Sequence, residues 1–217
     1  MLISEVCLLT HDLAATTTFY TEVLQLSVRE QSGTAVCFAV GDTLLTFHHS
    51  SAPEAPFYHL AFSIPHNLAA EAQAWMAERV PILPGPAGEA ILNFPAWQAR
   101  AFYFHDNNGN ILECIARQPL SNALPELCAP FLLSINEVGL PAHNVWQEAA
   151  ALHASYNVPY FSRGPELPDF TVLGDDHGLF IVPAAGRGWL PTGRPAERHW
   201  LRVQFEQQGR QHTLELR

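Results

Sequence analysis

The sequence predicts an α+β fold built from repeated strand–helix–strand–strand–strand (βαβββ) units. Two observations support this prediction. The same order of elements occurs twice within residues 1–117, and residues 135–145 repeat the pattern of residues 3–13 at a constant offset of 132 positions. A supersecondary unit that recurs in one chain predicts that its copies share one architecture. We expect three such units and a truncated fourth.

The first unit is expected at residues 1–50 and the second at residues 56–117. In each unit an apolar strand precedes a residue that suits a helix N-cap, Asp12 in the first and Asn67 in the second. Turn-forming residues then separate three further runs of strand composition. The expected strands span residues 2–10, 26–30, 34–40 and 43–48 in the first unit, and 57–64, 89–94, 99–105 and 110–116 in the second.

A segment with three prolines, residues 118–130, is expected to link this first domain to a second one at residues 131–217. The second domain begins with the repeated strand, and Asn144 takes the place of Asp12 as helix N-cap. Strands near 171–173 and 179–182 would complete a third βαβββ unit. The chain then has room for only a hairpin, at 200–206 and 211–216, which we interpret as a reduced fourth unit.

The composition limits the possible partners. The chain has 217 residues, 48% of them hydrophobic, and a formal net charge of −10. Nucleic acids and anionic membranes bind basic surfaces, so neither is an expected partner. There is no apolar run long enough to span a membrane and no signal-peptide pattern, so a cytoplasmic location is expected. The four cysteines form no C-x-x-C pair.

The first strand of each unit carries an ionisable residue on its less bulky face. These residues are Glu5, His59 and Glu137, and, with a weaker alignment, His199. Glu113 lies in the middle of the last strand of the second unit, on a face with apolar neighbours. A carboxylate in that position is costly if it is buried without a partner. Small residues beside a potential ligand suit the wall of a cavity.

Two motifs resemble those of the vicinal oxygen chelate superfamily, which includes glyoxalase I, extradiol dioxygenases, fosfomycin-resistance transferases and bleomycin-resistance proteins. One is the helix segment that ends in Phe19-Tyr20. The other is residues 102–113, FYFHDNNGNILE, close to the family pattern of an aromatic residue, Asp-Pro-x-Gly-Asn, an apolar residue and Glu. The resemblance implies paired βαβββ units whose half-open mixed sheets curl around a metal, with residues 1–50 paired with 56–117.

Carried over residue by residue, the resemblance implies a metal site at Glu5, His59 and Glu113, with Glu113 as the catalytic residue. Glu5 departs from the more common His, and the fourth ligand position of glyoxalase I falls on Thr46. Two carboxylates and one imidazole favour a divalent ion such as Mn, Fe or Mg, and Zn and Ni stay open. A second, weaker candidate set is formed by Glu137, His199 and Glu215.

The resemblance implies a metal-dependent enzyme, such as a lyase, isomerase, dioxygenase or transferase, that acts on a small molecule with vicinal oxygens. The alternative is a metal-free protein that binds a drug or metabolite, as the bleomycin-resistance branch does. Its cleft would be aromatic, with candidates Phe94, Trp97, Phe102 and Phe104. A third possibility is a non-catalytic member whose last unit mediates assembly. The partner is expected to be a small molecule, and the chain a monomer or homodimer.

Overall fold

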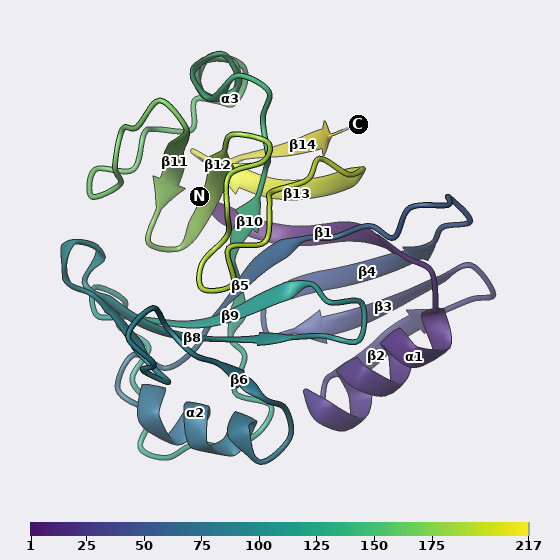
Figure 1. Cartoon of the computed structure of the whole chain (residues 1–217). Coiled ribbons are helices and arrows are strands. Elements are labelled where there is room, and N and C mark those ends of the chain that lie inside the picture. The colour runs from purple at the N-terminus through teal and green to yellow at the C-terminus, as the bar shows by residue number, and fades with distance from the viewer. Residues whose placement is uncertain (217) are drawn as a thin grey trace.

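The computed structural model describes residues 1–216 and contains two mixed β-sheets with three helices packed against them (Figure 1). The first sheet has six strands in the order β14-β13-β1-β4-β3-β2. The second has eight strands in the order β11-β12-β10-β5-β9-β8-β6, with β7 paired to β8. This is the α+β class that the repeated pattern predicted.

The first unit shows the predicted order of elements. Its strands are β1 (Leu2–Thr10), β2 (Ser27–Gln31), β3 (Ala35–Val40) and β4 (Thr43–His49). Helix α1 (Leu13–Thr18) begins after Asp12, whose Oδ1 accepts a hydrogen bond from the Ala15 amide at 2.9 Å. The helix continues into a π-helical turn, Phe19–Val23.

The second unit contains β5 (His59–Ser63), helix α2 (Ala69–Ala77), β6 (Ile82–Leu83), β7 (Leu92–Phe94), a short 3-10 turn (Pro95–Trp97), β8 (Ala99–His105) and β9 (Ile111–Arg117). The predicted cap Asn67 does not cap α2, which begins after Leu68. The Asn67 side-chain amide instead exchanges two hydrogen bonds with the backbone of Leu124, at 2.7 and 3.1 Å. It fastens the segment after β9 to the start of the helix.

The third unit is shorter than predicted. It contains β10 (Ser134–Gly139), helix α3 (Val145–Tyr156), β11 (Phe170–Asp175) and β12 (Gly178–Pro183). The predicted cap is observed, because Asn144 Oδ1 accepts a hydrogen bond from the Gln147 amide at 3.0 Å. Between α3 and β11 the chain forms isolated bridges, such as Tyr160 with Leu173, in place of a further strand. The predicted hairpin is present as β13 (Leu201–Gln207) and β14 (Arg210–Leu216).

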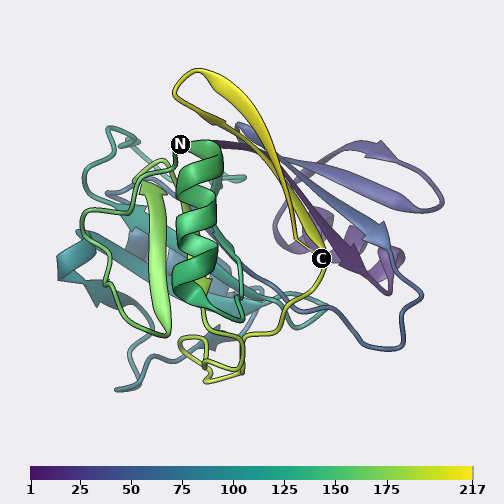
Figure 2. The same cartoon turned by 90° about the horizontal axis from the view of Figure 1, so that it is seen from above.

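The units pair differently from the prediction. We expected the first unit to pair with the second and the third with the hairpin. The observed sheets join the first unit to the hairpin through β1 and β13, and the second unit to the third through β5 and β10. Figure 2 shows the C-terminal hairpin lying along the N-terminal strand. The prediction failed because β1 and β10 carry the same pattern, so either could have met the free edge of β5.

One hydrophobic core joins the two sheets. It includes residues from the first unit, the second, the third and the hairpin, such as Val6, Phe62, Phe180 and Phe205. The alternation predicted for the first strand of the second unit is observed, since Leu60 and Phe62 enter this core while Ala61 faces the opposite side of the second sheet. That opposite side carries a smaller apolar cluster and the candidate site.

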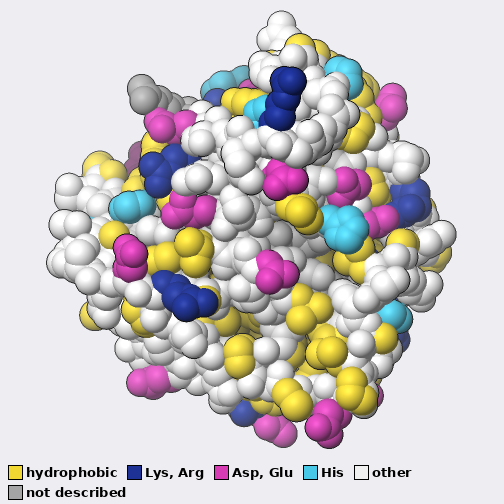
Figure 3. Space-filling view, turned by 180° about the vertical axis from the view of Figure 1, so that it is seen from behind, with side chains coloured by type: hydrophobic (Ala, Val, Ile, Leu, Met, Phe, Trp, Pro, Cys, Tyr) yellow, Lys and Arg dark blue, Asp and Glu magenta, His cyan; other side chains and the backbone are white. Residues whose placement is uncertain are grey.

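Basic side chains are sparse on the surface, as the composition of the chain indicates. The chain contains no lysine, and on the face shown in Figure 3 the Arg side chains lie apart from one another, with acidic side chains between them. None of the helices in residues 1–216 combines the length and apolar character needed to cross a membrane.

Candidate metal centre

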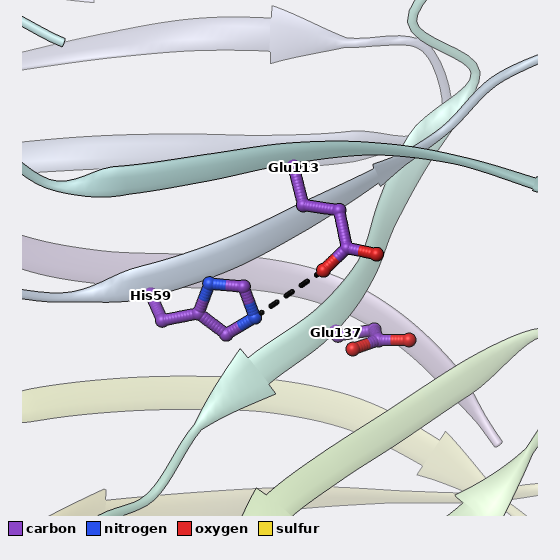
Figure 4. A group of neighbouring side chains, drawn as sticks. All are labelled: His59, Glu113 and Glu137. Atoms are coloured by element: carbon purple, nitrogen blue, oxygen red, sulfur yellow. Dashed lines mark ion pairs between the residues drawn. The ribbon is translucent and has the colours of Figure 1, made fainter. Parts of the chain in front are cut away.

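Three ionisable side chains meet on one face of the second sheet: His59 from β5, Glu113 from β9 and Glu137 from β10 (Figure 4). One potential ligand atom from each lies within 4.8 Å of the other two. Ala61 pairs with Glu113 on one neighbouring strand and with Glu137 on the other. Side chains two residues apart on a strand share a face, so His59 joins both carboxylates. The small side chain of Ala61 leaves the space between them open.

The imidazole of His59 is held in one orientation. Its Nδ1–H donates a hydrogen bond to the carbonyl of Ile111 at 3.2 Å, because a carbonyl can only accept. This leaves Nε2 without its proton, 3.5 Å from Glu113 Oε2. Burial lowers the pKa of His59 to about 4, so the ring is neutral at pH 7. A neutral imidazole whose other nitrogen is fixed by a carbonyl is the form that binds metals.

Glu113 is the carboxyl group of the cluster that retains a proton most readily. Burial, followed by the negative charge of Glu137, raises the pKa of Glu113 well above its usual range. Arg117 and a hydrogen bond from Tyr103 act in the opposite direction. Tyr103 lies directly opposite Glu113 in the β8–β9 pair. A divalent cation at the cluster would displace this proton and replace its charge.

Glu137 has a permanent cationic partner. The guanidinium of Arg117, which is fully buried, donates a hydrogen bond from Nη2 to Glu137 Oε1. Arg117 Nε donates to Asn136 Oδ1 at 2.7 Å, and Nη1 lies 3.8 Å from Asp176 Oδ1. Burial raises the pKa of Glu137 and Arg117 opposes this effect. Arg117 thus occupies one carboxylate oxygen of Glu137, and the second oxygen of Glu137 is left for the cluster.

A cavity of about 230 Å³ opens onto the three side chains. Its remaining wall is mainly apolar and aromatic, with contributions from Phe94, Trp97, Tyr103, Ile181, Trp189 and Leu190. Phe94 and Trp97 were predicted to line such a cleft. Phe102 and Phe104, also predicted, lie in the shared core on the other face of the sheet.

The structure brings together two residues of the first predicted ligand set and leaves the third elsewhere. Glu5 lies on β1 in the other sheet, where Thr46 Oγ1 donates a hydrogen bond to Oε1 at 3.2 Å and Gln204 Nε2 donates to Oε2. Arg202 Nη2 is 3.9 Å from Glu5 Oε2. Glu5 therefore sits at the position in the first sheet that His59 occupies in the second.

The second predicted set is also divided. Only Glu137 belongs to the observed cluster. His199 precedes β13 and its Nε2 lies 3.1 Å from Glu197 Oε2, while Glu215 is on β14 opposite Arg202. The repeat correctly marked Glu137 as the equivalent of Glu5, but combining it with His59 and Glu113 required knowing which strands pair.

Sequence reasoning also missed the residues that support the three side chains. Arg117 was within reach of the pattern, because positions 113, 115 and 117 share one face of an alternating strand. Tyr103 could be assigned only from the strand register, and Trp189 approaches His59 from a distant loop.

Comparison with known proteins identifies the family. Residues 2–114 match the model of the Glyoxalase/Bleomycin resistance protein/Dioxygenase superfamily, which covers just over half of the chain. The chain belongs to this superfamily. The match confirms the resemblance that the two motifs indicated. It spans the first two units of this glyoxalase-superfamily protein and ends before Glu137, so the cluster combines residues inside and outside the matched segment.

The fold is shared with a solved structure, and two further structures align with part of the chain. A candidate dioxygenase from Bacillus subtilis aligns with a TM-score of 0.63 and 18% identity over 84% of this chain, which spans 63% of that protein. A glyoxalase/bleomycin resistance protein/dioxygenase from Nocardioides aligns at 0.45 and 21% over 59% of this chain and 90% of its own. The Listeria monocytogenes fosfomycin resistance protein FosX, in complex with Mn(II), aligns at 0.42 and 21% over 54% of this chain and 90% of its own. The comparison with curated proteins gave no significant match.

Proposed function

We propose that the chain is a metal-dependent enzyme that acts on a small molecule with vicinal oxygens, and that His59, Glu113 and Glu137 hold its divalent cation. The observation that carries this proposal is the convergence of three buried candidate ligand side chains, from three adjacent strands, in the wall of a mainly apolar and aromatic cavity. Membership of a superfamily named for glyoxalases and dioxygenases supports the same class of chemistry.

The residues fit such an ion in spacing. Ligand atoms about 2.1 Å from one cation are separated from each other by roughly 3–4 Å. The three candidate atoms lie within 4.8 Å of one another, so side-chain rotations of modest size would complete the site. Their donor set, two carboxylates and one neutral imidazole, suits Mn²⁺ or Fe²⁺ and leaves coordination positions for a substrate. On β12 the place from which a fourth ligand could reach the cluster is taken by Ile181, which pairs with Gly139 and lines the cavity. Isoleucine cannot bind a metal.

The surrounding residues have separate tasks. Arg117 hydrogen-bonds to the carboxylate of Glu137, and Tyr103 hydrogen-bonds to that of Glu113. Each contact fixes the direction in which its carboxyl group faces the cluster. Trp97 and Trp189 offer flat apolar surfaces to the body of a substrate and exclude water from its reacting end. A bound divalent cation would act as a Lewis acid on the two substrate oxygens. Glu113 is then the proposed group for accepting or returning a proton at the substrate.

A metal-free binding protein is the second candidate, and one observation favours it. Arg117 already compensates the charge of Glu137, and a proton on Glu113 would leave the cluster neutral without any cation. The aromatic wall of the cavity then suits a planar drug or metabolite. The two candidates make opposite predictions for metal content.

The deciding experiment measures metal content by plasma mass spectrometry after reconstitution with Mn²⁺, Fe²⁺, Zn²⁺ or Ni²⁺. Wild type is compared with Glu113→Gln, Glu137→Gln and the matched control Glu5→Gln, which changes the same side chain in the other sheet. The metalloenzyme proposal expects near-stoichiometric metal in wild type and Glu5→Gln, and little in the other two variants. Equal metal in all four proteins, or none in any, would contradict it.

A further inference from the structure

Trp189 lies against the imidazole of His59 without belonging to the ligand cluster. The two ring centroids are 4.6 Å apart with an interplanar angle of 38°. Trp189 is 5% exposed and forms part of the wall of the 230 Å³ cavity. It comes from the loop between β12 and β13, more than a hundred residues away from His59 in the sequence. Because the two segments are so distant in the sequence, their contact depends on the tertiary structure around the loop that carries Trp189.

The loop holds the indole firmly. The amide of Trp189 donates to the carbonyl of Arg194 at 2.8 Å, and the amide of Gly193 donates to the carbonyl of Trp189 at 2.7 Å. The guanidinium of Arg194 then lies 3.6 Å from the centroid of Phe57, next to the start of β5. These contacts fix the turn that carries Trp189 to the strand that carries His59.

The strand beside β5 in the same sheet provides the space for the indole. Gly139 lies on β10, two residues after Glu137, and has a conventional strand conformation, so its backbone does not require glycine. A Cβ atom at this position would lie 2.9 Å from Trp189 Cη2 and 3.0 Å from Cζ2. An aromatic ring cannot bend away from such a contact, so any side chain at 139 would displace the indole.

From these contacts we infer that Trp189 is a positioning residue for His59, and that Gly139 is required so that the indole can reach the imidazole. The hydrogen bond to Ile111 fixes one edge of the imidazole, and Trp189 fixes one face. Together they leave Nε2 as the only free nitrogen and direct it to the carboxylates. The inference deepens the proposed metal site, and it concerns the orientation of a side chain, which can be measured in the metal-free protein.

The test uses ¹⁵N-histidine NMR to observe the tautomer and ring exchange of His59 in metal-free protein, with its signals assigned by their loss in His59→Gln. Trp189→Ala removes the indole and leaves the strands unchanged. Gly139→Ala keeps Trp189 and all three ligands but displaces the indole, and its Cβ would also lie 3.3 Å from the carbonyl oxygen of His59. Trp189→Phe restores an aromatic face. Two matched controls carry the same chemical changes elsewhere: Trp146→Ala on the exposed side of α3, and Gly33→Ala, where a Cβ meets nothing within 4 Å.

Wild type, Trp189→Phe and both controls are expected to show one neutral tautomer protonated at Nδ1. Trp189→Ala and Gly139→Ala are expected to lose this single state and to show exchange between two tautomers. In a parallel titration they should bind Mn²⁺ about 10–100-fold more weakly than wild type, the usual effect of losing a residue that orients a ligand.

The NMR measurement tests the positioning of His59, and the metal titration tests the proposed function, so each claim can be contradicted without the other. If Gly139→Ala, or a folded Trp189→Ala, keeps the wild-type His59 signals, Trp189 does not position His59 and the inference is wrong. If the signals change as expected but wild type binds no Mn²⁺, Fe²⁺, Zn²⁺ or Ni²⁺, the proposed function is wrong while the positioning of His59 stands. Gly139→Ala keeps the test decisive should Trp189→Ala fail to fold.

Discussion

Arg117, at the end of β9, and Glu137, on β10, form a buried ion pair on one face of the second sheet, where β5 lies between their two strands. Both side chains are almost completely removed from solvent. A buried ion pair offsets the cost of desolvating two charges only while both partners are present. The stability of this protein and the charge of its candidate site therefore depend on the same contact.

Arg117→Met should destabilise the metal-free protein by about 3–5 kcal/mol, because Glu137 would be left as an uncompensated buried carboxylate. Urea unfolding followed by circular dichroism measures the change. Saturating Mn²⁺ should recover part of the loss, since the cation would supply the missing positive charge.

The double variant Arg117→Met/Glu137→Leu is the control for this prediction. It removes both charges and should be considerably more stable than Arg117→Met alone. If the single and double variants were equally unstable, the loss would come from packing around Arg117 and not from its charge.

The observed pairing of the first unit with the C-terminal hairpin can be tested by cross-linking. Cys7 on β1 lies directly opposite Arg202 on β13. Opposed residues in an antiparallel pair have Cα atoms about 4.5–5.5 Å apart, which is within the range of a disulfide. Oxidised Arg202→Cys should therefore form a disulfide with Cys7, detected by peptide mapping without reductant.

Burial, followed by the charge of Glu5, raises the pKa of Cys7 to about 11, so its reactive thiolate is scarce at neutral pH. Arg202 lowers this pKa in the wild-type protein, so its replacement raises the pKa of Cys7 further, and the rate of cross-linking should increase as the pH rises through the alkaline range. Gln204→Cys is the matched control, because it lies opposite Glu5 and only diagonally across from Cys7. A disulfide in the control, or none in Arg202→Cys, would contradict the observed register.

The sequence was informative where structure is local. The helix caps Asp12 and Asn144, the turn after Phe104 and the C-terminal hairpin depend on a few consecutive residues, and each lies where the pattern placed it. Even a helix cap cannot always be predicted locally, because the Asn67 side chain hydrogen-bonds with the distant backbone of Leu124 and not with the helix. Two ligand candidates, His59 and Glu113, came from one unit and lie close together because β5 pairs with β9 within that unit.

The rest could not be read from the sequence because the repeat itself makes it ambiguous. Glu5 and Glu137 occupy the same position in equivalent strands, and each strand has an edge able to pair with β5. The choice depends on the core that forms between the sheets, where Val6 and Phe205 pack with Phe180 from the third unit. That choice moves one ligand candidate out of the cluster and brings in another.

Gly41, in the first unit, packs closely against Leu133 at the start of the third unit. Gly41→Ala should therefore be strongly destabilising. Its φ is +51°, and a Cβ would lie 1.9 Å from the carbonyl oxygen of Leu133. That carbonyl also accepts a hydrogen bond from the Asp42 amide at 3.0 Å, which the displacement would break. We expect a loss of about 2–4 kcal/mol from left-handed strain and the lost contact.

Gly33→Ala is the matched control for Gly41→Ala. It makes the same change in a turn of the same unit where a Cβ has open space, and it should alter stability by less than about 0.5 kcal/mol. Urea unfolding of the two variants compares them directly. Equal stability would show that the first unit does not rest on Leu133.

Asp106 organises the turn between β8 and β9, which carries the family motif and leads into Glu113. Its Oδ1 accepts hydrogen bonds from the amides of Asn108 and Asn110, both at 2.9 Å, and its Oδ2 accepts from Asn110 Nδ2 at 2.8 Å and the Tyr20 hydroxyl at 3.0 Å. Asp106→Asn would turn an acceptor into a donor facing other donors. The expected loss is about 1–3 kcal/mol in urea unfolding.

A double-mutant cycle with Tyr20→Phe separates the contribution of the hydroxyl contact. Because Tyr20 and Asp106 are both buried and share a hydrogen bond, the double variant should lose less stability than the sum of the single ones. Strict additivity would show that the Tyr20 contact contributes nothing and that the backbone bonds alone fix the turn. The metal content of Asp106→Asn should also fall if the turn sets the direction of β9, and full occupancy in a folded Asp106→Asn protein would place the control of Glu113 in the strand pairing with β5 instead.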